Sequence, residues 1–394
     1  MLKICLMKSF QSKCANMYPN LGDSEFKSIR FNVLHSGKAR SLVTSCNLSV
    51  NQLILADASG NVWAIDTAKS KKQWSIKLKH GLRFGFHFIN GQLFAFHEKG
   101  LVRISKENGE IETLVTFRHV HSPVLINDHF YLQESAQGST SKGNLIKINP
   151  ITLKVDTLYE ESTKRSMGNI YSREICAWSE DRILFFADSH LRSYDVGSGV
   201  IASVLEDKYQ NIAGLLTVND HVFFIPNFDW ERDKSLRQHP HFQRMLHVDS
   251  NLIINIVEDE DQFSGSLSYS GSSLFRRQSD AIATFAGLVF HINGKHYEKI
   301  GRLIANDQYP RLPNHSKLVQ FKDKTYIFFD ASYGNYAEEV GFVISEVGAN
   351  NQYTRLERYI TGKRGKNFGT NIIHAFDDYL AVCGDGHYHL LQLK

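Results

Sequence analysis

The sequence is poor in cysteine, and its cysteines follow no recognisable pattern. There are five among 394 residues, they are widely spaced, and no C-x-x-C motif occurs: Cys5, Cys14, Cys46, Cys176 and Cys383. An odd number at wide spacing does not suit a disulfide framework. We therefore expect reduced thiols.

Long apolar runs are also missing. The N-terminal stretch MLKICLMKSFQSKC has only four apolar residues in a row, between Lys3 and Lys8. A signal peptide needs a longer run, and no later segment approaches the ~18 apolar residues of a membrane span. These features predict a soluble, cytoplasmic protein without a membrane partner.

Excess charge and enzyme signatures are lacking as well. The chain has 45 Lys and Arg against 41 Asp and Glu, a net charge of +4 that is too small to indicate a nucleic-acid surface. No G-x-S-x-G, H-E-x-x-H, G-x-x-x-x-G-K-[ST] or EF-hand motif occurs. We expect no nucleic-acid partner, no cofactor and no transition metal.

What the sequence does contain is a repeat of short apolar runs separated by polar turns. The clearest copy spans residues 51–76, and further copies start near residues 90, 127, 181, 219, 322 and 377. The runs are rich in Val, Ile, Leu, Phe and Tyr and end at Gly, Asn or Asp, which is typical of strands. The interval from 219 to 323 is about twice the others, which predicts a hidden copy at 281–300.

The second run of most copies ends on a short polar residue. These are Asp66, Ser105, Asn149, Asp195, Asp249 and Ser345. Such side chains accept hydrogen bonds from the backbone of the following turn. A four-stranded unit every ~40–50 residues is the period of a β-propeller blade. The prediction is an all-β fold, a single propeller of seven or eight four-stranded blades.

The segment SGNVWAIDTAKSKKQW, residues 59–74, resembles the repeat of the PQQ-like (quinoprotein-type) propellers. The positions that match that repeat are Gly60, Val62, Ala64, Ile65, Asp66, Lys71 and Trp74. The other copies keep the spacing but lose the tryptophan, with Thr113 and Ser203 in its place. The resemblance implies the propeller fold.

The dehydrogenases of that superfamily hold pyrroloquinoline quinone with adjacent disulfide-bonded cysteines and a calcium site. This chain has no Cys-Cys pair. The resemblance therefore implies a non-catalytic, protein-binding member rather than a redox enzyme.

The two ends of the chain are expected to meet. The last unit lacks an outer strand, and residues 26–34, FKSIRFNVL, are strand-like. Pairing this segment with the last blade would close the ring and remove two exposed edges. The alternative is a free N-terminal arm. The predicted organisation is a tail at 1–22 and one propeller domain at 23–394.

Three copies enlarge the loop between their second and third strands, at 133–144, 226–244 and 330–341. Long loops on a rigid scaffold are where binding usually occurs, and aromatic and arginine side chains are enriched in interface hot spots. The predicted partner-binding residues are Phe228, Trp230, Arg232, Arg237, His239, His241, Tyr333, Tyr336, Glu338 and Glu339. The alternative is that Trp230 and Phe242 only fix their own loop to the rim.

Other polar groupings are weaker. His239 and His241 form an H-x-H pair without neighbouring Cys or carboxylate ligands, and the acidic stretches 258–261 and 229–233 suit solvated loops.

Two functions remain open. The first is a cytoplasmic adaptor or inhibitor that binds another protein, and a bacterial immunity protein that masks a toxin or effector is one subtype. The second is an enzyme, such as a polysaccharide lyase or hydrolase, with histidines and carboxylates in the central funnel. An enzyme needs polar groups with shifted pKa values that converge on one point, whereas a binder needs a broad aromatic and charged surface.

Overall fold

The computed structural model describes residues 31–393. Gaps fall at 40–41, 50, 58, 98, 118–119, 136–142, 163–174, 206–210, 219–220, 228–233, 242–243, 250–252, 258–271, 277–279, 286, 295, 304–315, 322–323, 331–338, 349, 364–371, 377–378 and 385–386. The described residues form two compact units. One takes in the described parts of Met1–Leu82, Ser273–His291 and Glu298–Lys394, and the other those of Arg83–Ser272 and Ile292–Tyr297.

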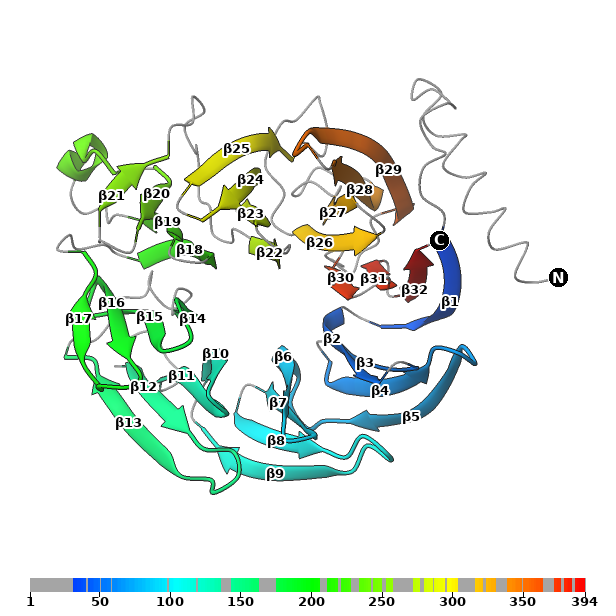
Figure 1. The fold of residues 1–394 in the computed structure, drawn as a ribbon. Helices are drawn as coiled ribbons and strands as arrows, with labels where there is room; N and C mark the ends of the chain where they lie inside the picture. The colour runs from blue at the N-terminus through cyan, green and yellow to red at the C-terminus, as the bar shows by residue number, and fades with distance from the viewer. Residues whose placement is uncertain are drawn as a thin grey trace. The chain divides into compact units, whose positions relative to one another are not determined.

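The described strands assemble into eight four-stranded antiparallel sheets, which confirms the predicted all-β propeller architecture of repeated blades (Figure 1). Four sheets lie in or largely in the first unit: β1 (Phe31–Lys38), β32 (His387–Leu393), β31 (Tyr379–Gly384) and β30 (Ile372–Phe376); β2 (Leu42–Ser49), β3 (Gln52–Asp57), β4 (Asn61–Asp66) and β5 (Lys71–Lys77); β22 (Ser272–Arg276), β23 (Ala281–Phe285), β24 (Leu288–Asn293) and β25 (His296–Arg302); and β26 (Ser316–Phe321), β27 (Lys324–Asp330), β28 (Glu339–Val347) and β29 (Tyr353–Lys363).

The other four lie in or largely in the second unit: β6 (Leu82–Ile89), β7 (Gln92–His97), β8 (Gly100–Ile104) and β9 (Ile111–Thr116); β10 (Val120–Ile126), β11 (His129–Ser135), β12 (Gly143–Ile148) and β13 (Val155–Glu160); β14 (Ile175–Ala177), β15 (Arg182–Ala187), β16 (His190–Asp195) and β17 (Ile201–Ser203); and β18 (Asn211–Val218), β19 (His221–Asn227), β20 (Leu246–Val248) and β21 (Ile254–Ile256). The hidden copy predicted at 281–300 is real, because it forms β23, β24 and most of β25. The described part of the chain has one helix, the 3₁₀ helix η2 (Lys234–Gln238).

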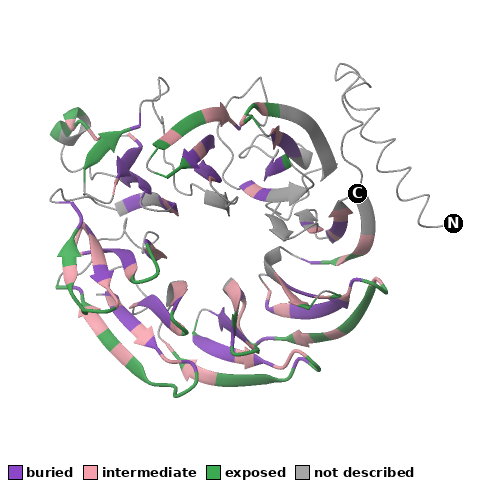
Figure 2. Ribbon diagram, in the orientation of Figure 1, coloured by how far each residue is buried: buried purple, intermediate pink, exposed green. Residues whose placement is uncertain are grey.

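Burial differs between the strands of a blade, and this difference explains the sequence pattern. In β3 every residue after Gln52 is buried, whereas β5 has only exposed and half-buried residues. Figure 2 shows the same contrast between middle and last strands in other blades. The middle strands read as continuous apolar runs because both of their faces are covered, as in any sheet packed on two sides.

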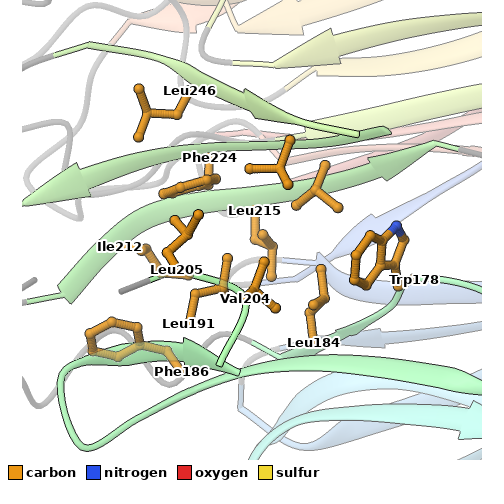
Figure 3. Packing of buried hydrophobic residues seen from close by; sticks show 12 residues of the cluster. Trp178, Leu184, Phe186, Leu191, Val204, Leu205, Ile212, Leu215, Phe224 and Leu246 are labelled. Atoms are coloured by element: carbon orange, nitrogen blue, oxygen red, sulfur yellow. The ribbon is translucent and has the colours of Figure 1, made fainter. Parts of the chain in front are cut away.

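Neighbouring blades of one unit share apolar cores. The largest side chains of one such core come from β14–β17 and β18–β21, and they point toward one another between the two sheets (Figure 3): Trp178, Leu184, Phe186, Leu191, Leu215, Phe224 and Leu246. Close packing of this kind contributes about 1.5–3 kcal/mol per fully buried large side chain.

The predicted capping of the turn between the third and fourth strands is confirmed in five blades. The side-chain oxygen of the last third-strand residue, or of the residue next to it, accepts a backbone N–H in each case: Asp66 from Lys69, Ser105 from Asn108, Asn149 from Ile151 and Thr152, Asp195 from Ser198, and Asp249 from Ile253. The prediction for Ser345 is wrong. Ser345 is fully buried within β28, and its hydroxyl lies 2.8 Å from the hydroxyl of Tyr353.

The predicted pairing of the N-terminal strand with the last blade is confirmed for Phe31–Lys38. β1 pairs with β32 over its whole length, from Phe31 opposite Leu393 to Lys38 opposite His387 (Figure 1). Residues 26–30 of the predicted segment lie outside the described residues. The pairing excludes a free arm for β1, and the single-domain boundaries at 23–394 stay a prediction.

The side chains at this junction fit closely. His35 of β1 lies 2.9 Å from the hydroxyl of the buried Tyr388, which also contacts Trp63 of the next sheet with ring centroids 5.1 Å apart. A Cβ atom on Gly37 would come within 2.7 Å of the Tyr388 ring. Burial raises the pKa of Tyr388 to about 12, so this hydroxyl stays protonated at neutral pH.

The turn between β3 and β4 is built around a buried carboxylate. Asp57 is 1% exposed and accepts the backbone N–H groups of Ser59 and Asn61 and the side-chain amide of Asn61. Gly60 adopts a φ of +85°, and a Cβ atom there would lie 3.0 Å from Leu78 O and 3.1 Å from His80 O. The glycine in the repeat is therefore required both by conformation and by space.

In the described part of the chain, no helix combines the length and apolar character needed to span a bilayer.

Removing residues 1–38 should destabilise the whole protein, because β32 loses its ladder partner and Tyr388 loses His35. We expect a fall of ~10 °C or more in the melting temperature. Removing only residues 1–22 retains β1 and should leave the melting temperature unchanged. Equal melting temperatures for the two truncations would refute the importance of the β1–β32 pairing.

Gly60→Ala should cost about 2–3 kcal/mol in urea unfolding, from the unfavourable φ and the approach to two carbonyl oxygens. Gly91→Ala is the matched control, since Gly91 has a φ of +74° and no atom within 4 Å of the added Cβ. The control should cost only about 1 kcal/mol. The steric argument fails if the two variants lose the same stability.

Candidate functional site

The three enlarged loops predicted from the sequence occupy one position in their blades. They connect β11 to β12, β19 to β20 and β27 to β28, which are the second and third strands of three different sheets. The corresponding connections are only two or three residues long: β3–β4, β7–β8, β15–β16, β23–β24 and β31–β32. The predicted equivalence of the three loops within their blades is therefore confirmed.

Most of the predicted contact residues lie outside the described residues: Phe228, Trp230 and Arg232 in the gap 228–233, and Tyr333, Tyr336 and Glu338 in the gap 331–338. Glu339 is the first residue of β28, and Arg237 belongs to η2. The acidic stretches at 229–233 and 258–261 and the residue Phe242 also fall in gaps. The assignment of these residues to a partner interface stays a prediction.

The described part of the β19–β20 connection has a defined local structure. In η2, Lys234, Ser235 and Gln238 are exposed, and the connection ends at the fully buried Met245. The backbone N–H of His241 donates to Nδ1 of His239 at 3.1 Å, and the two rings lie 5.0 Å apart. This bond leaves the proton of a neutral His239 on Nε2. Among the described residues, no group of three or more His, Cys, Asp or Glu side chains is placed to hold a metal.

The β11–β12 connection is shorter than the predicted insertion at 133–144, and that boundary is wrong. β11 continues to Ser135 and β12 begins at Gly143, with Ser135 opposite Gly143 in the ladder. Gln133 is buried in β11 and donates from Nε2 to the carbonyl of Phe186 in the neighbouring blade at 2.9 Å. The hydrogen bond to the adjacent sheet lets a polar side chain occupy a buried position in the strand.

A set of polar contacts fixes the base of this connection. We call it the loop-base cluster, and it comprises Gln133, Tyr159, Glu161, Asp188 and Arg192. The carboxylate of the buried Glu161 accepts the N–H of Gly143 at 2.6 Å, while the backbone N–H of Glu161 donates to Gly143 O at 2.9 Å.

The other half of the loop-base cluster comes from the next blade. Asp188 accepts hydrogen bonds from the Tyr159 hydroxyl and from the Ser162 N–H, and the Arg192 guanidinium lies 5.1 Å over the Tyr159 ring. Burial, followed by the hydrogen bond to Asp188, raises the pKa of Tyr159 to about 12. Asp188 and Ser189 have φ values of 49° and 66°, as a two-residue hairpin turn requires. Sequence reasoning missed this cluster, since its members come from separate repeats.

The shifted pKa values do not form a catalytic constellation among the described residues. The Asp66 carboxyl has a lowered pKa because the Lys69 N–H donates to it, and the Asp195 pKa is lowered by the Ser198 N–H. Both carboxyl groups cap the turns that follow their strands. The lowered pKa values of His35, His87 and His247 arise first from burial. Each of these shifts has a structural cause, and none marks a shared reaction centre.

Two histidines form a buried chain of hydrogen bonds in the second unit. His221 Nε2 lies 2.8 Å from Gly294 O, so it donates, and its Nδ1 accepts from Nε2 of His247 at 2.6 Å. His247 is 4% exposed, packs against Tyr297 with ring centroids 4.5 Å apart, and leaves Nδ1 without a hydrogen-bond partner among the described residues. Burial and the neighbouring His221 lower the pKa of His247 to about 4.

No protein-family model matches this chain, and no curated protein matches it. Many solved structures match its fold. The computationally designed Ika8 protein is 12% identical with a TM-score of 0.57, and the match covers 91% of this chain and 99% of that one. BamB from Moraxella catarrhalis is 12% identical with a TM-score of 0.53 over 93% and 98% of the two chains.

Sqt1 from Saccharomyces cerevisiae is 10% identical with a TM-score of 0.54 over 92% of this chain and 99% of that chain. Identities this low establish similarity of fold alone. The comparisons agree with the sequence and the sheet topology that the chain has a β-propeller fold.

Stability should fall as the pH is lowered from about 6.5 to 4, because unfolded His247 takes up a proton that the folded state excludes. The loss attributable to this residue is up to about 3 kcal/mol. The glutamine in His247→Gln keeps a donor toward His221 but does not titrate. The free energy of urea unfolding of this variant should therefore change less between about pH 6.5 and 4 than that of the wild type.

His296→Gln, a change at an exposed histidine, is the control and should show the wild-type pH dependence. Parallel pH profiles for the wild type and His247→Gln would show that His247 is not held neutral by the fold.

Proposed function

We propose that this chain is a non-catalytic, protein-binding propeller of the PQQ-like superfamily that acts in the cytoplasm as an adaptor or inhibitor. The observation that carries the proposal is the recurrence of enlarged connections at one blade position, β11–β12, β19–β20 and β27–β28. A regular scaffold that lengthens the same loop in three blades is organised as a binding platform.

The electrostatics of the described residues support this proposal over the enzyme alternative. The buried carboxylate of Glu161 accepts a hydrogen bond from the N–H of Gly143. The carboxylate of Asp188 accepts hydrogen bonds from the Tyr159 hydroxyl and the Ser162 N–H. These groups anchor a loop base, and binding loops gain affinity when their ends are fixed before the partner arrives.

Within this class we favour an inhibitor that masks another protein, such as an immunity protein that neutralises a toxin or effector. In such a complex, Trp230 would fill a pocket at the centre of the interface and Arg232 and Arg237 would pair with acidic groups, which are the residue types that dominate hot spots. Tyr333 and Tyr336 would add contact area, while Glu338 and Glu339 would steer a basic region of the partner.

The test uses a double variant and a matched control. Trp230→Ala with Arg237→Ala should weaken binding of a partner isolated with the wild-type protein by at least ~100-fold, and the melting temperature should change little. The control is Ile151→Ala with Lys154→Ala, which removes an exposed apolar and a basic side chain from the β12–β13 region. It should bind like the wild type.

Normal binding by the folded double variant would overturn the proposed site. Unfolding of the double variant would instead show that Trp230 is a packing residue of its own loop. Turnover of a polysaccharide that both variants retain would support the enzyme alternative.

A further inference from the structure

The strand β21 is the last strand of its sheet, and unlike most other end strands it contains no charged residue. End strands usually carry charges that discourage pairing with another chain. Charged residues are present in most of the others: Lys71 and Lys72 in β5, Glu112 in β9, Asp156 and Glu160 in β13, and Glu298 and Lys299 in β25. β21 is Ile254–Asn255–Ile256, with all three residues exposed.

β17 is also uncharged, but it offers an edge of a different kind. Its sequence is Ile-Ala-Ser, and Ala202 and Ser203 are its exposed residues. β21 instead exposes two large apolar side chains, Ile254 at 36% and Ile256 at 40%, and Ile253 immediately before them is 55% exposed. The combination of an open edge and exposed isoleucines is typical of a strand-pairing surface.

The backbone hydrogen bonds fix which groups of β21 face outward. The N–H of Val257 donates to Met245 O, and the N–H of Asp249 donates to Ile253 O, so the odd-numbered residues of this segment bond to β20. In an antiparallel ladder the intervening residues turn their N–H and C=O groups the other way. Ile254 and Ile256 therefore present these groups at the open edge, and no described strand pairs with them.

The side chains are arranged symmetrically about Asn255. Ile256 lies opposite Leu246 in the ladder and Ile254 lies opposite Val248. Cross-strand partners share a face of the sheet, so both isoleucines continue the apolar face that Leu246 and Val248 bury in the core shown in Figure 3. Asn255 lies on the other face, opposite His247.

We propose that β21 pairs antiparallel with β21 of a second copy of this chain, across a two-fold axis at Asn255. This register places Ile254 opposite Ile256 of the second copy, so the outward N–H and C=O groups meet as two hydrogen-bonded pairs and form four hydrogen bonds. The two Ile–Ile pairs share one face, and the two Asn255 side chains meet on the other. The I-N-I sequence is self-complementary in this register, and none of its three residues is charged.

The contact surface is small, so the dimer is weak. Sedimentation velocity of the full-length protein from ~1 to ~200 µM should show a monomer–dimer equilibrium, as expected for an interface at the small end of specific contacts. A single monomeric species across this range would overturn the proposal.

Asn255→Asp tests the symmetry itself. This nearly isosteric change should leave the monomer folded, but it places two carboxylates face to face on the two-fold axis. The dimer should weaken ~5-fold or more at low salt and recover part of this loss in ~0.5 M NaCl, because like charges directly opposite repel and salt screens them. Asn108→Asp is the matched control, since Asn108 is an exposed residue of the β8–β9 turn, and it should dimerise like the wild type.

A dimer that Asn255→Asp does not weaken would contradict the two-fold register. A wild-type monomer whose β21 amides are protected from exchange only by an extended peptide of another protein would show that the edge serves a different partner, and would also overturn the proposal. Since this test needs no partner protein, it is independent of the proposed binding function.

Discussion

The pairing of β1 with β32 is the constraint on which the last sheet depends. It joins residues near the two ends of the sequence, Phe31–Lys38 and His387–Leu393, into one four-stranded sheet. Tyr388 reinforces it, because its ring packs on Trp63 and its hydroxyl meets His35. Without β1, the edge of β32 would be exposed and the buried Tyr388 would lose its contact with His35, so the stability of this sheet depends on β1.

Hydrogen bonds between neighbouring blades also anchor one of the enlarged connections. Gln133 bonds to the carbonyl of Phe186, and Asp188 bonds to Tyr159, so the base of the β11–β12 connection is held by the next blade of the same unit. These hydrogen bonds offset part of the cost of placing polar groups inside a largely apolar interface, while Oε1 of Gln133 has no hydrogen-bond partner among the described residues.

The sequence predicts much of the architecture and little of the polar detail. Apolar runs ending in Asp66, Asn149 or Asp195 identify the third strands correctly. Each of these side chains bonds to a backbone N–H only a few residues later, so a short stretch of sequence contains the whole pattern. Ser345 fails because a serine inside a strand looks the same as a serine at its end, and only its contact with Tyr353 distinguishes them. The loop boundary at Gln133 and the His221–His247 pair depend on residues far apart in sequence, which no repeat pattern reveals.

We infer that the partner-binding surface lies on the connections between the second and third strands of the blades. Hydrogen–deuterium exchange of the chain with and without its bound partner tests this most directly. We expect protection on binding to concentrate at residues 228–245, with further protection at 136–142 and 331–338 and no change in the turns between third and fourth strands. Protection confined to those turns, with none at 228–245, would contradict it.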